Sequence, residues 1–325
     1  MLEYLAQCVI IAFKPVYNLL ADGSSRYYWV YIIFGLAISW LAYGSNGRHR
    51  EFFARLFDKN VWWSVSAQND YRMIMINPVL KFSVLSWATV NFDTISSFTS
   101  GTLHSAGVTG AAGTEWAWAW GAALTFTLFL VNDFMRWWLH YLAHKIPLLW
   151  EFHKVHHSAE VLNFTTSERF HPVDALTFGA VSTTAVAIVN GGFIAFAGDH
   201  LTVSTIAGAN AVWATTNYIG GVLRHSQFWI SFGPRIERWL ISPAMHHIHH
   251  SGDPKHFDKN MGGALAIWDR MFGTIYYANE TVKEFGIGEE TKEFRSLSAL
   301  YFRPFVSAYR RFVPETEQTD PAKAA

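Results

Sequence analysis

Three histidine motifs decide the fold: His140-Tyr-Leu-Ala-His144, His153-Lys-Val-His156-His157 and His246-His-Ile-His249-His250. An i, i+4 spacing, or an i, i+3, i+4 spacing, places all the imidazoles of a motif on one face of a helix. Ser242 and Pro243, directly before the third motif, are typical of a helix N-cap and a first-turn proline. We therefore predict helices whose histidine faces converge on a common site.

The number of these histidines indicates more than one metal ion. Neutral imidazole is a good ligand for iron, zinc, copper and nickel, and one ion takes about six ligands at most. The three motifs and His225 supply nine rings, which suit two ions. Without metal, so many packed imidazoles would be costly, because burial and mutual repulsion penalise their charged form. The predicted ligands are His140, His144, His153, His156, His157, His171, His225, His246, His249 and His250.

The roles predicted for His171 and for the histidines outside this list are less specific. His171 is a ligand candidate that could equally be a hydrogen-bonded core residue. His247 lies off the triplet face, so it is expected beside the site or facing solvent. His256 is a candidate for a structural role, and the isolated His49, His104 and His200 are taken as background. We predict no catalytic side chain beyond the metal site.

Composition indicates an integral membrane protein. Hydrophobic residues make up 51% of the 325 residues and charged residues 15%, whereas soluble domains carry about 25% charged residues. The net charge of zero gives no case for nucleic-acid binding. A single cysteine, Cys8, excludes an internal disulfide framework and a zinc site of several thiolates.

Hydropathy predicts an all-α protein with four to five membrane-embedded helices and a helical cap that holds the histidines. A spanning helix needs about 20 mostly apolar residues. The two later segments are rich in small residues and could instead form one tight hairpin over 175–218. The candidate segments are 27–43, 73–92, 116–131 continuing as a helix to 144, 175–197 and 201–218.

Charge placement orients these segments. The loop at 44–72 holds five Lys or Arg and the stretch at 136–174 holds four, whereas 93–115 and 191–201 hold none. The positive-inside rule then places the histidine clusters on the cytoplasmic face, of a bacterial inner membrane or the endoplasmic reticulum. We divide the chain into membrane helices at 1–131, a catalytic region at 132–276 and a cytoplasmic tail at 277–325. The apolar N-terminus has no positive n-region, so we expect no cleavable signal.

At these motifs the sequence resembles the fatty acid hydroxylase/sterol desaturase superfamily, from about Asn132 to Tyr276. That resemblance implies a non-haem di-iron centre that uses O₂ to oxidise an unactivated C–H bond in a lipid. Zinc is an alternative occupant of such imidazole sites in recombinant protein. The surrounding sequence matches too, at Trp150-Glu-Phe-His153, Phe232-Gly-Pro, Ser242-Pro-Ala-Met-His246, Asp258-Lys-Asn260 and Trp268-Asp-Arg-Met-Phe-Gly273-Thr.

Several functional alternatives stay open. Hydroxylation is the first prediction and desaturation the second, on a fatty acyl chain, sterol, sphingoid base or aminolipid. A zinc-dependent membrane hydrolase would need a motif such as His-Glu-x-x-His, which is missing. A metal transporter would place histidines at mid-membrane instead of beyond the helix ends.

Two further expectations concern the surroundings of the site. The chain has no flavin, haem or iron–sulfur motif, so we expect an external electron donor, a cytochrome b5 or ferredoxin with its reductase. Acidic residues near the ligands could orient imidazoles or form salt bridges with Arg169, Arg270 or Lys145. Those acidic residues are Glu151, Glu168, Asp174 and Asp269.

Overall fold

The described part of the chain is mostly helical, which agrees with the predicted all-α class. The computed structural model describes residues 17–18, 20–83, 91–108, 110 and 114–312. Its helices are α2 (Trp29–Gly44), α3 (His49–Leu56), α4 (Lys59–Trp62), α5 (Val65–Ser83), α6 (Phe92–Ser105), α7 (Ala117–Lys145), α8 (Pro147–His157), α9 (Pro172–Ala197), α10 (Ala211–Tyr218), α11 (Pro234–Glu237), α12 (Pro243–His249), α13 (Ile267–Phe272) and α14 (Leu297–Arg310). The strands described are β1 (Thr205–Ile206) and β2 (Ala209–Asn210), which pair antiparallel.

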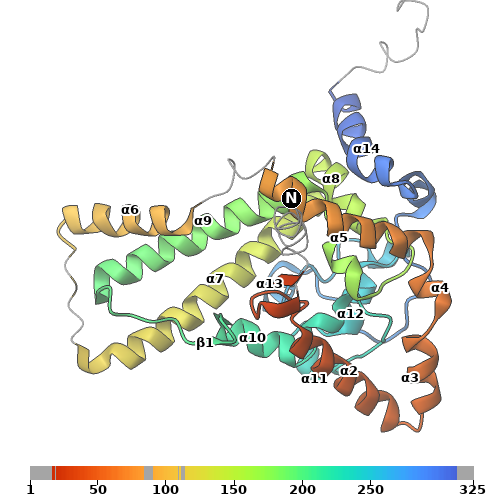
Figure 1. The fold of residues 1–325 in the computed structure, drawn as a ribbon, viewed down its shortest axis with the longest axis horizontal. Coiled ribbons are helices and arrows are strands. Elements are labelled where there is room, and N and C mark those ends of the chain that lie inside the picture. The colour runs from red at the N-terminus through yellow and green to blue at the C-terminus, as the bar shows by residue number, and fades with distance from the viewer. Residues whose placement is uncertain (1–16, 19, 84–90, 109, 111–113, 313–325) are drawn as a thin grey trace, which may run out of the picture.

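Helices α6, α7 and α9 form an arm (Figure 1). The arm extends from a compact region that contains α5, α8 and α12 and is called the cap. α9 packs against both α6 and α7. A Cβ at Gly191 of α9 would lie 2.4 Å from the carbonyl oxygen of Ser96 in α6, so only glycine permits this approach. The amide of Asn190 adds a hydrogen bond of 2.9 Å to the Ser96 hydroxyl. The two helices are therefore held in close contact.

One described helix, α9, is both long and apolar enough to cross a membrane, and α2 is a shorter apolar helix. The helices predicted at 27–43, 116–144 and 175–197 are found as α2, α7 and α9. α5 begins at Val65, eight residues before the predicted start at 73. Three parts of the predictions lie outside the described residues: 84–90 of that segment, the N-terminal apolar stretch with Cys8, and the end of the predicted tail at 313–325.

The prediction of a helix over 201–218 is wrong. The chain there forms the β1–β2 hairpin, and only Ala211–Tyr218 is helical. Ala207 and Gly208 have positive φ angles of 52° and 82°, which turn the chain back on itself. Asn210 then caps α10 through its side-chain oxygen and donates a 2.8 Å hydrogen bond to the Thr125 carbonyl of α7. These side-chain bonds anchor the segment to α7 as a hairpin.

A buried ion pair fixes the cap beside α8. The Arg169 guanidinium lies 2.8 Å from the Asp70 carboxylate, and both side chains are almost completely buried. Arg169 also donates to the carbonyl of Val155, at a distance of 3.0 Å. The segment that follows α8 is thereby tied to α5, and the histidine-bearing end of α8 is held in place.

Candidate metal centre

The turn between α7 and α8 brings the first two histidine motifs face to face. Ile146 is extended between the helices, and Pro147 starts α8 at its first position, where a missing N–H costs nothing. As a result, His140 and His153 have ring centroids 4.7 Å apart, and His144 and His157 are equally close. The hairpin of helices thus forms one wall of the site.

The third motif completes two groups of imidazoles. Ser242 caps α12 by accepting from the Met245 N–H, as predicted, and Pro243 follows it. The ring centroid of His249 in α12 lies 4.6 Å from that of His157 in α8. The ring centroid of His250, the C-cap of α12, lies 4.5 Å from that of His156. The predicted convergence of the histidine helices is therefore confirmed.

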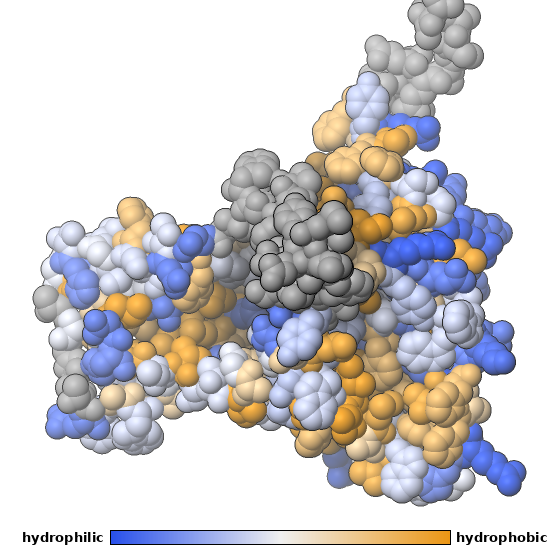
Figure 2. Space-filling view, in the orientation of Figure 1, coloured by the Kyte–Doolittle hydropathy of each residue, from blue (hydrophilic) through white to orange (hydrophobic). Residues whose placement is uncertain are grey.

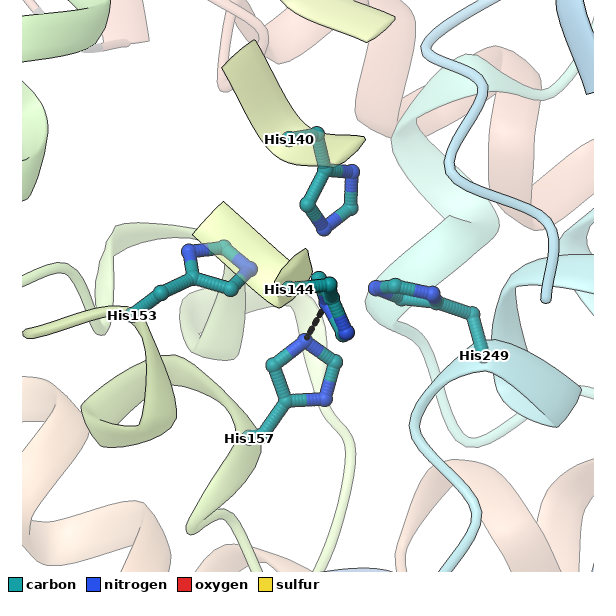
Figure 3. A group of neighbouring side chains, drawn as sticks. All are labelled: His140, His144, His153, His157 and His249. Carbon is teal, nitrogen blue, oxygen red and sulfur yellow. Dashed lines mark hydrogen bonds between the residues drawn. The ribbon is translucent and has the colours of Figure 1, made fainter. Parts of the chain in front are cut away.

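The first group contains five histidines whose rings point toward a common centre (Figure 3). One nitrogen from each ring lies within 4.8 Å of the corresponding nitrogen of every other. The group comprises His140, His144, His153, His157 and His249.

The second group contains four buried histidines with their Nε2 atoms together: His156, His225, His246 and His250. The closest Nε2 atoms, those of His225 and His246, are 2.9 Å apart, and other pairs in the group are 3.1 to 3.2 Å apart. Metal–nitrogen bonds of about 2.0 Å in tetrahedral geometry require nitrogen separations of about 3.3 Å. The Nε2 cluster is close to that size.

Helix geometry explains how each triplet divides between the groups. On a helix, residues i and i+4 are about 40° apart, whereas i+3 is turned about 60° to the other side of i. His153 and His157 accordingly join the first group and His156 the second. In α12 the pair His246 and His250 joins the second group, and His249 the first. The nine rings counted from the sequence are the same nine that the structure gathers.

The hydrogen bonding of the first group fits a metal ion. The Nε2 atoms of His140, His153 and His249 are buried and have no hydrogen-bond partner among the described residues. Their Nδ1 atoms lie 2.8, 2.9 and 2.8 Å from the Met261 carbonyl, the Asp174 carboxylate and the Lys259 carbonyl. An Nδ1–H held in this way leaves the lone pair on Nε2, directed into the site.

Burial keeps these imidazoles in the neutral form that binds metal. It lowers the pKa of His156, His157, His246 and His250 well below the ordinary value, and neighbouring imidazoles lower it further. For His249 the pKa falls to about 3, because burial outweighs the hydrogen bond to Lys259. No proton therefore has to leave these rings near neutral pH before a metal binds.

The acidic residues named from the sequence have different roles. Asp174 orients His153, which is one of the two roles expected for it. Asp269 accepts from the Met261 N–H, so it supports the segment whose carbonyl holds His140. Glu151 instead pairs with Lys154 and Arg311, which are not the partners expected.

Sequence reasoning missed Asp258 as a partner of the site. Its carboxylate lies 3.4 Å from Nδ1 of His144. Asp258 and Asn260 both have positive φ angles, 59° and 55°, and the Asn260 amide donates to the Met245 carbonyl and the Tyr276 carbonyl. The Asp258-Lys-Asn260 motif was the signal that could have indicated this role, because its loop holds the rings of His144 and His249.

His171, a predicted ligand, is placed by the structure apart from the other nine predicted ligands. It is the N-cap of α9, and its Nδ1 accepts from the Val173 N–H at 3.2 Å. Its Nε2 lies 3.0 Å from the Tyr301 carbonyl in α14. Both ring nitrogens are occupied, and the ring lies outside both histidine groups.

His247 and His256 are both buried outside the two histidine groups. His247 is buried, not solvent-facing, and its ring lies against Trp229 and Phe285. His256 is buried outside both groups, with Nδ1 2.9 Å from the Ser251 hydroxyl.

A large cavity of about 710 Å³ approaches the histidines from the arm. Its walls include apolar residues of α7 and α9, and Figure 2 shows a hollow with apolar surface between these helices. A smaller cavity of about 70 Å³ continues from it and is lined by histidines of both groups. The two cavities share Arg26, Arg136, Phe170, Phe178 and Trp213.

A separate cavity of about 350 Å³ reaches the first group from the cap. It is lined by His144, His157 and His249, together with Trp150, Asp258 and Glu290. The histidine centre therefore has one approach through the arm and another through the cap.

These features define a class of helical protein in which two groups of histidines that could hold metal ions lie at the base of a helical arm. Residues 125–274 match the fatty acid hydroxylase family. The region that carries the centre is therefore similar to the fatty acid hydroxylase family, in agreement with the resemblance that the motifs indicated.

Curated relatives align with the same region. Alkylglycerol monooxygenase of Danio rerio is 32% identical over 159 residues, 49% of this chain and 31% of the relative. The Homo sapiens protein of that name is 30% identical over 165 residues, 51% of this chain and 32% of the relative. Ornithine lipid hydroxylase OlsE of Rhizobium tropici is 31% identical over 162 residues, 50% of this chain and 44% of the relative. The alignments thus span less than half of each relative, and no solved structure matches.

Proposed function

We propose that this protein is an integral-membrane oxygenase that hydroxylates a lipid at a centre of two iron ions. The observation that carries the proposal is the division of nine convergent imidazoles into groups of five and four, next to a cavity whose walls include apolar residues of α7 and α9. Relatives named as a monooxygenase and a lipid hydroxylase share this region, which supports the same reaction class.

The proposed ligands are the nine histidines of the two groups. The imidazole set suits iron, and it also accepts zinc. When bound, the ions would supply the redox capacity to activate O₂. The chain's own contribution is to hold the rings: Asp174, Asp258 and the carbonyls of Lys259 and Met261 fix the orientation of the first group.

The overall reaction we propose inserts one oxygen atom of O₂ into a C–H bond and releases the other as water. Two electrons and two protons complete the balance. We propose that an external one-electron carrier, a cytochrome b5 or a ferredoxin with its reductase, supplies the electrons from the cap side. The cavity beside His144, His157 and His249 supports this direction, because it approaches the centre away from the arm.

The arm supports a substrate that arrives from the bilayer. The large cavity lies between α7 and α9, and α9 is the helix long and apolar enough to span a membrane. Its volume is within the usual range of about 300–1,000 Å³ for small-molecule sites. We propose further membrane-embedded helices in addition to α9, with the cap and the histidines on the cytoplasmic face.

Desaturation of a lipid is the second candidate, because it would use the same centre and the same cavity. A zinc hydrolase is less well supported, since no carboxylate of the described residues is among the two histidine groups.

Two measurements test the proposal. Anaerobic purification followed by elemental analysis should give about two iron ions per chain in active protein, and about one or fewer would contradict a two-metal centre. Comparative lipid mass spectrometry of cells with and without the gene should reveal a lipid heavier by one oxygen atom. A product lighter by two hydrogen atoms would instead establish desaturation, and an unchanged lipid profile would contradict both.

A further inference from the structure

Three arginines surround the passage between the large cavity and the histidines. Arg26 and Arg136 line both cavities, and Arg224 lines the smaller one. The Arg224 side chain is buried, with the residue 6% exposed. The Nε atoms of Arg136 and Arg224 are buried without a hydrogen-bond partner among the described residues. A buried N–H of a guanidinium without a partner is costly, so the passage has unused hydrogen-bond donors.

The passage has fewer carboxylates than guanidinium groups. Asp133 faces the arginines, but its oxygens already accept from the N–H groups of Ala264 and Leu265 and from the Trp268 indole. Glu168 is the other carboxylate on the wall of the large cavity. Three guanidinium groups thus face two carboxylates.

The position of these arginines relates them directly to the histidines. Arg136 lies one helical turn before His140 on α7, so their Cβ atoms are about 6 Å apart. Arg224 immediately precedes His225. The guanidinium of Arg136 lies 5.3 Å from the ring centroid of Trp213, which holds it beside the passage.

We propose that this passage binds the anionic oxyacid group of the lipid substrate, a phosphate or a carboxylate, through Arg136 and Arg224 with Arg26 beside them. The planar fork of a guanidinium suits both anions, because it donates two parallel hydrogen bonds. This inference rests on the proposed function only in treating the bound lipid as the substrate.

A consequence concerns the position of oxidation. With its anionic group in the passage, the lipid would extend its alkyl chain into the large cavity, whose walls include Leu128, Phe129 and Val186. The carbon atoms nearest the histidines are then those within a few bonds of the anionic group. Hydroxylation is expected there and not near the end of the chain.

Binding to the metal-free full-length protein tests the proposal without O₂ or reductant. Three radiolabelled probes with the same acyl chain are compared in an uncharged detergent: lysophosphatidic acid, the free fatty acid and monoacylglycerol. We expect at least one anionic probe to bind about tenfold more tightly than monoacylglycerol, since charge-assisted hydrogen bonds contribute to it alone. Preference for the first or second probe identifies phosphate or carboxylate as the group recognised.

Arg136→Gln and Arg224→Gln should each lower the affinity for the preferred anionic probe about tenfold and leave the affinity for monoacylglycerol unchanged. The matched control is Arg235→Gln, at an exposed arginine of α11, which should change neither. Equal affinity for all three probes, or an equal loss for all three in Arg136→Gln, would overturn the proposal.

A second measurement covers variants that fail to fold. Added salt should weaken the anionic probe on the unaltered protein and leave monoacylglycerol unchanged, and Arg136→Lys should retain part of the preference. Absence of any salt effect would also overturn the proposal. Because no turnover is measured, loss of the binding preference is distinguishable from loss of the oxygenase activity.

Discussion

Nδ1 of His153 lies 2.9 Å from the Asp174 carboxylate, and both side chains are buried. This contact joins α8, which holds part of the histidine centre, to the first turn of α9, the candidate membrane span. It fixes the His153 ring with Nε2 directed into the first histidine group.

Replacing this carboxylate should weaken metal binding at the first group. Asp174→Asn removes the negative charge that holds the Nδ1–H of His153, and loss of such a partner typically costs about 10–100-fold in metal affinity. Metal content should be measured during titration with a chelator. Asp199→Asn, at an exposed position after α9, serves as the control and should behave as the unaltered protein does. If the two variants retained the same amount of metal at each chelator concentration, Asp174 would not support the centre.

Single substitutions in α12 should separate the two groups. His246→Ala and His249→Ala remove ligands from the second and first group respectively, so bound metal should fall from about two per chain toward one in each. His247→Ala is the matched control, because this ring is buried on the same helix outside both groups. Elemental analysis measures the change. Loss of metal in His247→Ala equal to that in the other two would argue against specific ligation.

His171 should contribute to stability and not to metal content. His171→Ala removes the cap of α9 and the contact with the Tyr301 carbonyl, so we expect a loss of about 1 kcal/mol in unfolding free energy. His171→Asn should recover part of this loss, because asparagine also caps helices. Thermal unfolding and elemental analysis measure the two quantities. A loss of metal in His171→Asn would restore this residue as a ligand candidate.

The buried pair of Asp70 and Arg169 should be essential for folding. Asp70→Asn leaves the buried guanidinium without its counter-charge, a change that typically costs about 3–5 kcal/mol. The control is a surface carboxylate: Glu51→Gln, which removes the charge that pairs with Arg48 and Arg55, should cost less than about 1 kcal/mol. Denaturant unfolding of the purified protein measures both. Similar small losses would mean that the buried pair is not needed.

Motif spacing alone indicated eight of the nine histidines of the centre. Local helix geometry makes residues i and i+4 neighbours, so pairs such as His153 and His157 were predictable from their separation in the chain. The helices at 27–43, 116–144 and 175–197 were predictable for a related reason, since continuous apolar runs favour helix. Local caps such as Ser242 were equally predictable, because a cap depends on only a few neighbouring residues.

Contacts between distant segments decided the rest. His171 and His225 both lie outside the three motifs, and their places depend on tertiary packing: His225 joins the second group, whereas His171 caps α9. The contact of Asp258 with His144 joins distant parts of the chain. Asp258 also pairs with Lys145, the residue after His144, from which it is 113 residues away in sequence. Side-chain spacing determines which residues share a helix face, but the packing of α7, α8 and α12 determines which faces meet.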